Sequence, residues 1–175
     1  RGLGDVYKRQ DESHPLRPRS PYGASKAAAR HLVKVYRDSY DLYAVQGWLF
    51  NHEGTRRGEE FVTRKITKGI SRIVRRIEAG EPFSAIELGN LDAKRDWGDS
   101  EDFVRSVWLM LNQDSPKDYV ISSGETHSIR EFVEECLQCA NIDGSFIGEG
   151  PEEQYIIANH LLEEHGLKST IVVTI

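Results

Sequence analysis

A β-rich run, Tyr43-Ala-Val-Gln-Gly-Trp-Leu-Phe50, separates two stretches whose apolar residues recur with helical spacing, residues 24–37 and 61–78. The same alternation continues downstream: helical spacing returns at 101–111 and 129–140, and shorter β-rich runs occur at 84–88 and 118–122. Ser128-Ile-Arg-Glu131 matches the capping-box pattern that marks the start of a helix. Helices that alternate with strands favour an α/β layer fold with parallel strands.

The composition restricts the class of protein. The 175 residues are 38% hydrophobic and 29% charged, which is typical of one soluble domain, or most of one, with enough apolar side chains for a core. The 23 basic and 28 acidic residues give a formal net charge of -5, which argues against non-specific binding to nucleic acid. No apolar run approaches the roughly 20 residues of a membrane-spanning helix, and two cysteines are too few for a disulfide scaffold. These features predict a cytoplasmic protein that binds neither nucleic acid nor a membrane.

We expect both ends of the sequence to be cut. Residues 1–10 contain no strand pattern, and Gly2-Leu-Gly4 is followed by Tyr7 where a dinucleotide-binding loop has its third glycine. This segment is therefore expected to be non-native or the end of a partial read. At the other end, a strand-like run, Thr170-Ile-Val-Val-Thr-Ile175, reaches the last residue.

Tyr22-Gly-Ala-Ser-Lys26 is the sharpest chemical pattern in the sequence. Side chains four residues apart share one face of a helix, and Ser20-Pro21 predicts a helix start just before them. A nearby ammonium favours the ionised form of a tyrosine, and a lysine can also hold the ribose hydroxyls of a nicotinamide nucleotide. The bare spacing is common, so an exposed helix pair without a function is the alternative. The small residues of Pro18-Arg-Ser-Pro-Tyr-Gly-Ala-Ser-Lys-Ala-Ala-Ala29 favour the catalytic interpretation, because they allow the helix to pack closely against a neighbour or a cofactor.

This context resembles the extended branch of the short-chain dehydrogenase/reductase superfamily. Four further motifs are similar, in order and spacing, to the GDP-mannose 4,6-dehydratase family: Leu49-Phe-Asn-His-Glu53, Arg56-Arg-Gly58, Phe61-Val-Thr-Arg-Lys-Ile66 and Leu88-Gly-Asn-Leu-Asp-Ala-Lys-Arg-Asp-Trp-Gly98. The resemblance runs from about Pro18 to Gly150 and is looser after that point.

The resemblance implies the second half of a Rossmann-like doubly wound parallel sheet, plus part of a smaller C-terminal substrate-binding α/β region. Residues 11–60 would be the C-terminal part of the NADP-binding domain. Residues 61–175 would be mostly the nucleotide-sugar region, with some elements returning to the Rossmann core. The glycine-rich loop and the catalytic threonine and glutamate of the family do not occur here. The chain is therefore expected to be a fragment, without its N-terminal part and C-terminal end, that is inactive and binds NADP poorly by itself.

The implied activity of the whole protein is that of a hydro-lyase, the NADP-dependent conversion of GDP-D-mannose to GDP-4-keto-6-deoxy-D-mannose. The resemblance assigns Tyr22 as the catalytic base and Lys26 as its partner, both also in contact with NADP. It adds His52 and Arg57 as further NADP contacts. The nucleotide-sugar pocket maps onto four residues: Asn51, Val62, Lys65 and Arg95. The family resemblance also implies a homo-oligomer, either a dimer or a tetramer.

The two further NADP contacts have simpler alternatives. The Asn51-His-Glu53 segment is predicted to be a loop directly after a strand, at the carboxyl edge of a parallel sheet where ligands of open α/β folds bind. His52 could equally cap backbone groups there. Arg56 and Arg57 could be a solvated charge pair, but the planar fork of arginine suits a phosphate and Gly58 allows close approach.

The two cations of the nucleotide-sugar pocket also have alternatives. Lys65 could be one more exposed cation of a helix that also carries Arg64 and Lys68. Arg95 could belong to a structural ion pair with a neighbouring aspartate, Asp92 or Asp96. Their positive charge nevertheless suits the GDP pyrophosphate in a chain that is otherwise acidic.

No metal site is predicted. Cys136 and Cys139 form a C-x-x-C pattern, but both fall in a helical stretch without a second such pair, so buried packing is the expected role. His160 and His165 are five residues apart and miss the four-residue spacing of a helical metal pair.

Two other functions stay open at this stage. A sister nucleotide-sugar epimerase or dehydratase would share Tyr22 and Lys26, but it should lack the combination of Asn51-His-Glu53 with Arg56-Arg-Gly58. A non-catalytic nucleotide sensor would keep the fold and differ only in the upstream threonine and glutamate.

Overall fold

The computed structural model describes residues 11–158 and 171–175, so the segment 1–10 and the pair His160 and His165 lie outside the described residues. The chain divides into two compact units. Unit 1 comprises residues 1–52 and 97–124, and unit 2 comprises residues 53–96 and 125–175. The chain thus passes between the units three times, and residues 97–124 return to the unit that contains residues 11–52.

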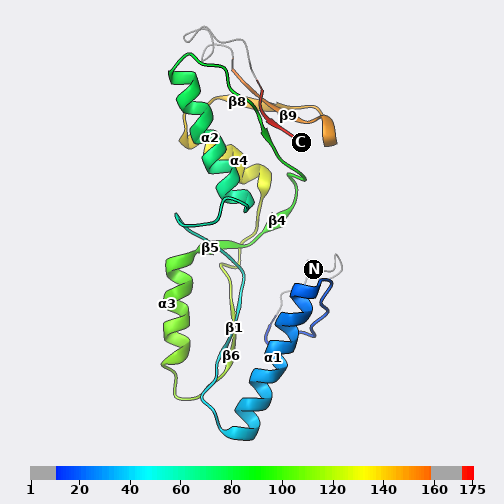
Figure 1. The fold of residues 1–175 in the computed structure, drawn as a ribbon, viewed down its shortest axis with the longest axis vertical. Coiled ribbons are helices and arrows are strands. Elements are labelled where there is room, and N and C mark those ends of the chain that lie inside the picture. Colours follow the sequence, from blue (N-terminus) through cyan, green and yellow to red (C-terminus); the bar gives the residue numbers. More distant parts are fainter. Residues whose placement is uncertain (1–10, 159–170) are drawn as a thin grey trace. The chain divides into compact units, whose positions relative to one another are not determined.

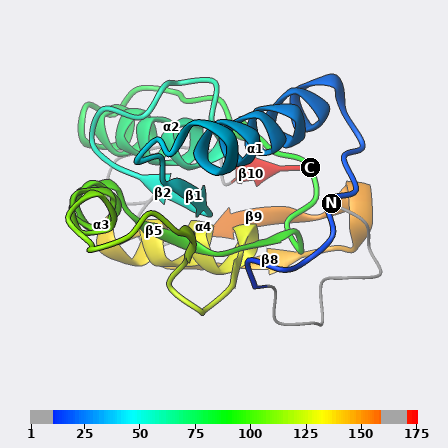
Figure 2. The same cartoon turned by 90° about the horizontal axis from the view of Figure 1, so that it is seen from below.

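Unit 1 is built around a parallel pair of strands. Its elements are α1 (Pro21–Tyr40), β1 (Gln46–Leu49), β5 (Trp97–Asp99), α3 (Ser100–Leu111) and β6 (Asp118–Ile121). β1 and β6 pair parallel, with Gln46 opposite Asp118 and Leu49 opposite Ile121. Figures 1 and 2 show β1 between α1 and α3. A short strand β2 (Asn51–Glu53) follows β1 and pairs with β5.

Helix α1 begins where the sequence predicts. Ser20 is its N-cap, and the Ser20 hydroxyl accepts a hydrogen bond of 3.0 Å from the backbone N–H of Gly23. Pro21 occupies the first helical position, which suits a residue without an N–H. The helix ends at Tyr40, before Asp41 in the left-handed region with φ 51°.

Polar contacts connect α1 to the strands. Arg37 Nη2 donates a 2.7 Å hydrogen bond to Asp118 Oδ1 at the start of β6. Arg30 lies about two helical turns before Arg37, on the same face of α1. Its Nε is 4.0 Å from Asp118 Oδ2, and its guanidinium is 4.2 Å from the centre of the Trp48 ring. None of the residues of α1 is buried.

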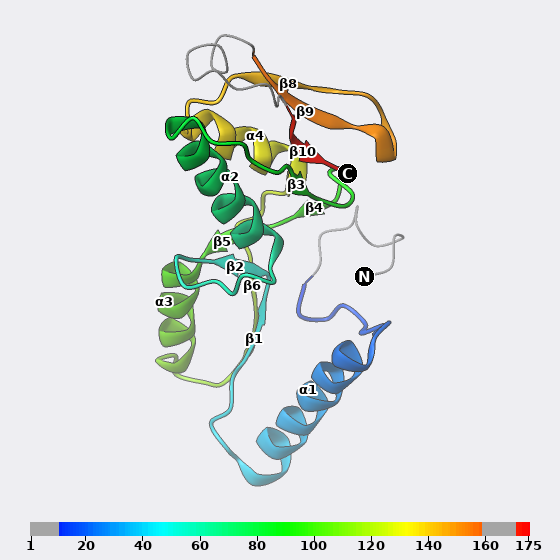
Figure 3. The same cartoon turned by 45° about the horizontal axis from the view of Figure 1, so that its top comes forward.

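Unit 2 combines two helices with a mixed sheet. Its elements are α2 (Val62–Glu78), β3 (Ile86–Glu87), β4 (Lys94–Arg95), β7 (His127–Ser128), α4 (Ile129–Cys139), β8 (Gly144–Ile147), η1 (Gly150–Glu152), β9 (Gln154–Ile157) and β10 (Ile171–Thr174). The larger sheet has the order β3-β10-β9-β8. β10 runs parallel to β3 and antiparallel to β9, and β8 is antiparallel to β9. Figure 3 shows α2 and α4 side by side below β8 and β9.

The core of unit 2 follows from helical periodicity. α2 carries isoleucine at positions three or four residues apart, and all four are at most 7% exposed: Ile66, Ile70, Ile73 and Ile77. Val133 and Leu137 on α4 and Val172 and Val173 on β10 are at most 1% exposed. α2 packs on α4, so these side chains exclude water from the centre of the unit.

The predicted helices and the predicted strand runs are confirmed, although their bounds shift by a few residues. The capping box at Ser128 is also confirmed, because its hydroxyl accepts from the N–H of Glu131 while the Glu131 carboxylate accepts from the N–H of Ser128. The prediction of a loop at residues 51–53 is wrong. This segment pairs with β5 as strand β2, because the chain changes partners after Phe50. In the described ranges, the helices are either too short or too polar to cross a membrane.

Candidate functional site

The eight residues proposed for the site divide between the two units. Unit 1 contains Tyr22, Lys26, Asn51 and His52. Unit 2 contains the other four: Arg57, Val62, Lys65 and Arg95. The residues implied in proton transfer therefore belong to one unit, and the two cations implied in pyrophosphate binding belong to the other.

Tyr22 and Lys26 share one face at the start of α1. The Lys26 Nζ lies 5.4 Å from the centre of the Tyr22 ring, a contact that the four-residue spacing predicts. Ser25 Oγ donates a 2.7 Å hydrogen bond to the Tyr22 carbonyl and so supports the first turn. The Tyr22 side chain is 72% exposed, so its phenol is open to a ligand.

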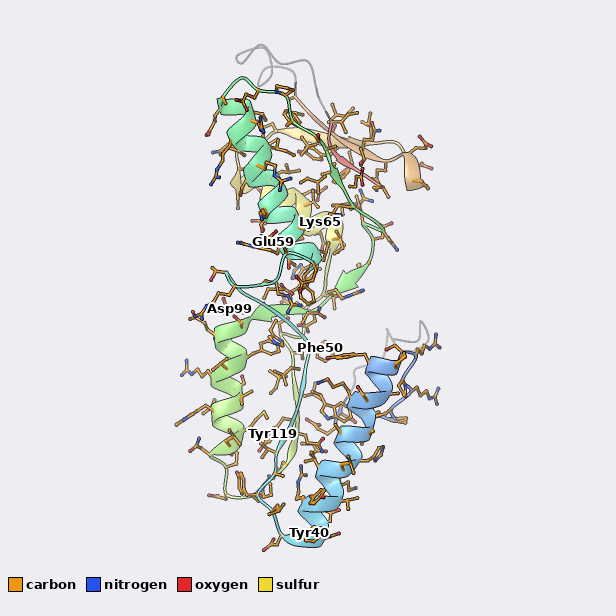
Figure 4. The ribbon with its side chains drawn as sticks, in the orientation of Figure 1. Tyr40, Phe50, Glu59, Lys65, Asp99 and Tyr119 are labelled. Atoms are coloured by element: carbon orange, nitrogen blue, oxygen red, sulfur yellow. The ribbon has the colours of Figure 1, made fainter. Side chains whose placement is uncertain are left out.

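His52 and Asn51 lie in β2, directly beyond the carboxyl end of β1. The His52 Nδ1 lies 3.0 Å from the Phe50 carbonyl, and its ring stacks on Phe103 with centroids 4.9 Å apart. A Cβ at Gly98 would lie 2.5 Å from the Phe103 ring, so glycine at this position lets Phe103 reach its place. The contacts of His52 with the Phe50 carbonyl and with the Phe103 ring fix the plane of its imidazole. Phe50 and Asp99, at the two ends of this region, are labelled in Figure 4.

Arg57 is held more firmly than an exposed loop cation. Its Nε lies 3.2 Å from Glu53 Oε2, although the two groups are not aligned for a hydrogen bond. The guanidinium also lies 3.5 Å from the centre of the Phe61 ring, and the Arg57 side chain is 25% exposed. Thr63 Oγ1 donates to the same Glu53 oxygen at 2.6 Å. The alternative of a solvated pair with Arg56 does not describe Arg57.

Val62 and Lys65 lie in the first turn of α2. Lys65 is labelled in Figure 4. The Lys65 Nζ donates to the Glu87 carbonyl at 2.5 Å. Lys65 lines a groove of about 450 Å³ between α2 and residues 82–87, which also contains the cations Lys68, Arg72 and Arg76. Lys68 forms an ion pair with Glu59. Arg76 also forms an ion pair, with Glu81, and Glu87 lines the same groove. Lys65 is therefore an exposed cation of a groove in which basic residues outnumber acidic ones.

Arg95 lies in β4 and is exposed. Its Nη1 donates a 2.7 Å hydrogen bond to the Lys94 carbonyl. Asp92, one of the partners considered from sequence, forms an ion pair with Arg130 at 3.1 Å. Asp96, the other partner considered from sequence, is buried, with 4% of its surface exposed.

The cysteines differ from their predicted common role. Cys136 is half-buried on α4, and burial raises the pKa of its thiol from 9.0 to about 11, so it is protonated at neutral pH. Cys139 is exposed, which contradicts the prediction of buried packing, because it lies at the last residue of α4 away from the buried face of Val133 and Leu137. Among the residues that the structure describes, no group of three or more His, Cys, Asp or Glu side chains has a geometry for a metal ion.

Sequence reasoning missed the residues that hold the candidates in place. Glu53 and Phe61 fix Arg57, and Phe103 fixes His52. Only the Glu53 contact has a signal in the sequence, an acid four residues before the arginine. The aromatic contacts depend on which segments meet in space.

A family model and several curated relatives match this chain. The family model described as GDP-mannose 4,6 dehydratase matches residues 3–166. A Homo sapiens GDP-mannose 4,6 dehydratase is 50% identical over 147 residues, which are 84% of this chain and 38% of the relative. The Drosophila melanogaster relative of the same name is 47% identical over 82% of this chain and 35% of its own length. The chain thus spans little more than a third of these curated relatives.

Solved structures share the fold. RMD from Pseudomonas aeruginosa, complexed with NADPH, has a TM-score of 0.66 and 27% identity over 80% of this chain and 49% of that chain. The Thermus thermophilus UDP-glucose 4-epimerase, in complex with NAD, has a TM-score of 0.59 and 28% identity over 78% of this chain and 43% of that chain. Together with the parallel pairing of β1 and β6, these likenesses confirm the predicted Rossmann-like α/β class.

Proposed function

The chain belongs to the GDP-mannose 4,6 dehydratase family, and we propose that it carries part of the active site of an enzyme that converts GDP-D-mannose to GDP-4-keto-6-deoxy-D-mannose with NADP. The observation that carries this proposal is the pair of Tyr22 and Lys26 on one face of α1, with the ammonium 5.4 Å from the ring centre.

Tyr22 acts as the base that removes the proton from the sugar 4-hydroxyl. Lys26 lies on the same face, with its Nζ 5.4 Å from the centre of the Tyr22 ring, and would contact the nucleotide there.

NADP supplies hydride transfer when it is bound, and four residues of this chain would hold it: Tyr22, Lys26, His52 and Arg57. Two observations support the fit. The His52 ring is fixed by Phe103 and the Phe50 carbonyl. The Arg57 guanidinium is fixed by Glu53 and Phe61, and a guanidinium with its orientation set in advance suits a phosphate.

The nucleotide sugar would be held by Asn51, Val62, Lys65 and Arg95. Lys65 and Arg95 provide positive charge for the pyrophosphate, and the positively charged groove beside Lys65 supports this assignment. The location is proposed to be the cytoplasm, and the protein is proposed to form a homodimer or homotetramer.

The test is Tyr22→Phe in the full-length protein that contains these residues. We expect turnover to fall by roughly 10²–10⁴-fold, with little change in NADP affinity, because a general base typically contributes this factor. Tyr36→Phe is a matched control, since Tyr36 is a half-exposed tyrosine of the same helix. Turnover of the Tyr22 variant within about twofold of the parent would remove Tyr22 from the mechanism.

A further inference from the structure

The ribbon formed by β4 and β7 brings a histidine beside Arg95. The two strands pair antiparallel, with Lys94 opposite Ser128 and Arg95 opposite His127. Directly opposite side chains of an antiparallel pair lie on the same face, with Cβ atoms about 4.5–5.5 Å apart. Arg95 and His127 are both exposed. Arg95 and His127 are therefore directly opposite residues on one face of this ribbon.

One ring nitrogen of His127 faces a fixed carboxylate. Its Nδ1 lies 3.6 Å from Glu131 Oε2 on the first turn of α4. The Glu131 carboxylate is held in place by a 2.7 Å hydrogen bond from the backbone N–H of Ser128, which lowers the pKa of Glu131. Because Nδ1 is next to this anion, Nε2 is the nitrogen available for a ligand.

The ribbon itself is anchored to the core of unit 2. The N–H of Ile129 donates to the Ala93 carbonyl at 3.2 Å, and the N–H of Arg130 donates to the Leu91 carbonyl at 2.9 Å. Leu91 is 2% exposed. The backbone that carries Arg95 and His127 is therefore fixed before a ligand arrives, which reduces the entropy lost on binding.

The charges around His127 come from two elements. β4 contributes the cations Lys94 and Arg95, and α4 contributes Glu131 and Arg130. Arg130 is already engaged by two carboxylates, those of Asp92 and Glu153. Lys94 is opposite Ser128, on the other face of the ribbon. A diphosphate next to Arg95 would offset the repulsion between Arg95 and a protonated His127 imidazole.

We propose that His127 is a second binding residue for the diphosphate of the nucleotide sugar, acting beside Arg95, and that its protonation strengthens binding. This inference rests on the proposed function, because it takes Arg95 to be a diphosphate contact. It adds a residue outside the motifs that the sequence singles out, together with a pH dependence of substrate affinity.

The test is a calorimetric titration of GDP into the full-length protein and its His127→Gln variant between about pH 5.5 and pH 8. The variant should bind GDP about three- to tenfold more weakly at the acidic end and within about twofold at the alkaline end. The protonation of GDP itself cancels in the ratio of the two affinities at each pH. His31→Gln, at an exposed histidine of α1, is the control and should leave this ratio near one throughout.

Arg95→Ala separates this inference from the function on which it rests. If Arg95→Ala weakens GDP binding while the His127→Gln ratio does not change with pH, the role of His127 is overturned and the proposed function stands. If Arg95→Ala leaves GDP affinity unchanged, the assignment of Arg95 to the nucleotide-sugar site is itself wrong. A weaker complex with Arg95→Ala and a ratio that grows toward acidic pH supports both.

Discussion

Unit 2 buries most of its large apolar side chains, whereas unit 1 buries only two of its own and leaves the others exposed or half-buried. Of the 17 buried hydrophobic residues that the structure describes, only Phe103 and Met110 belong to unit 1. Of the 15 exposed large hydrophobic side chains, 12 belong to unit 1, five of them on α1: Tyr22, Leu32, Val35, Tyr36 and Tyr40. The two units therefore have different sources of stability, because burial of apolar area is the main favourable contribution to folding.

Helices α2 and α1 illustrate the difference. The isoleucines of α2 repeat every three or four residues and face a sheet and a second helix. α1 has no buried residue and contacts its strands through Arg30 and Arg37. An exposed apolar surface of this extent is typical of a region that contacts a further partner or further chain. Tyr22 and Lys26 lie on this less protected helix.

The largest expected effect concerns the core of unit 2. Ile66→Ala in the 175-residue chain should lower the free energy of unfolding by about 2–5 kcal/mol, since Ile66 is 0% exposed and truncation leaves a cavity. Leu32→Ala on α1 should change it by less than about 0.5 kcal/mol, because Leu32 is 58% exposed. Denaturant unfolding followed by far-UV circular dichroism measures both. Equal losses would mean that the two units do not differ in packing.

A second prediction concerns the polar attachment of α1. Asp118→Asn should cost about 1–3 kcal/mol, because Arg37 and Arg30 would keep their charges without their partner in a partly buried place. All three tryptophans, Trp48, Trp97 and Trp108, belong to unit 1. Tryptophan fluorescence therefore reports unit 1 selectively. The fluorescence transition should move to lower denaturant, and an unchanged midpoint would show that the Asp118 pairs add nothing to unit 1.

A third prediction tests local capping in unit 2. Ser128→Ala removes the hydroxyl that accepts from the N–H of Glu131 at 3.1 Å, and it should cost about 1 kcal/mol. Thermal unfolding followed by circular dichroism measures the loss. Ser106→Ala is a matched control, because the Ser106 hydroxyl donates within α3 and caps no helix end. A Ser128 variant as stable as the control would mean that packing alone, and not the Ser128 cap, determines where α4 begins.

The smallest effect is chemical and concerns the reactivity of the two thiols. Cys139 should react with a thiol reagent at neutral pH well before Cys136, because Cys139 is exposed and the raised pKa of Cys136 keeps that thiol protonated. Burial favours the neutral thiol of Cys136 in the folded chain. The resulting contribution to stability is fully present below the ordinary pKa of 9.0 and is lost as the pH rises toward the raised pKa of about 11. Labelling of Cys136 should accelerate over this range. Mass spectrometry of timed samples gives both rates, and equal rates at pH 7 would contradict the difference in burial.

Much of the local structure could be predicted from the sequence. Helical spacing gave the positions of α1, α2, α3 and α4 to within a few residues, because the period of apolar side chains reflects one buried face and depends only on neighbours along the chain. The capping box at Ser128 and the shared face of Tyr22 and Lys26 are local in the same sense. The motifs that resemble the dehydratase family could likewise be recognised from the sequence alone.

Only the tertiary structure decided which segments meet. Nothing in residues 43–53 indicates that the chain leaves β6 after Phe50 and pairs with β5, since strand partners are chosen by segments far apart in sequence. The stacking of His52 on Phe103, the contact of Arg57 with Phe61 and the exposure of Cys139 depend on the same long-range choices. The position of His127 opposite Arg95 also depends on such a choice. The two residues are 32 apart in the sequence, and only the register of β4 against β7 brings them together.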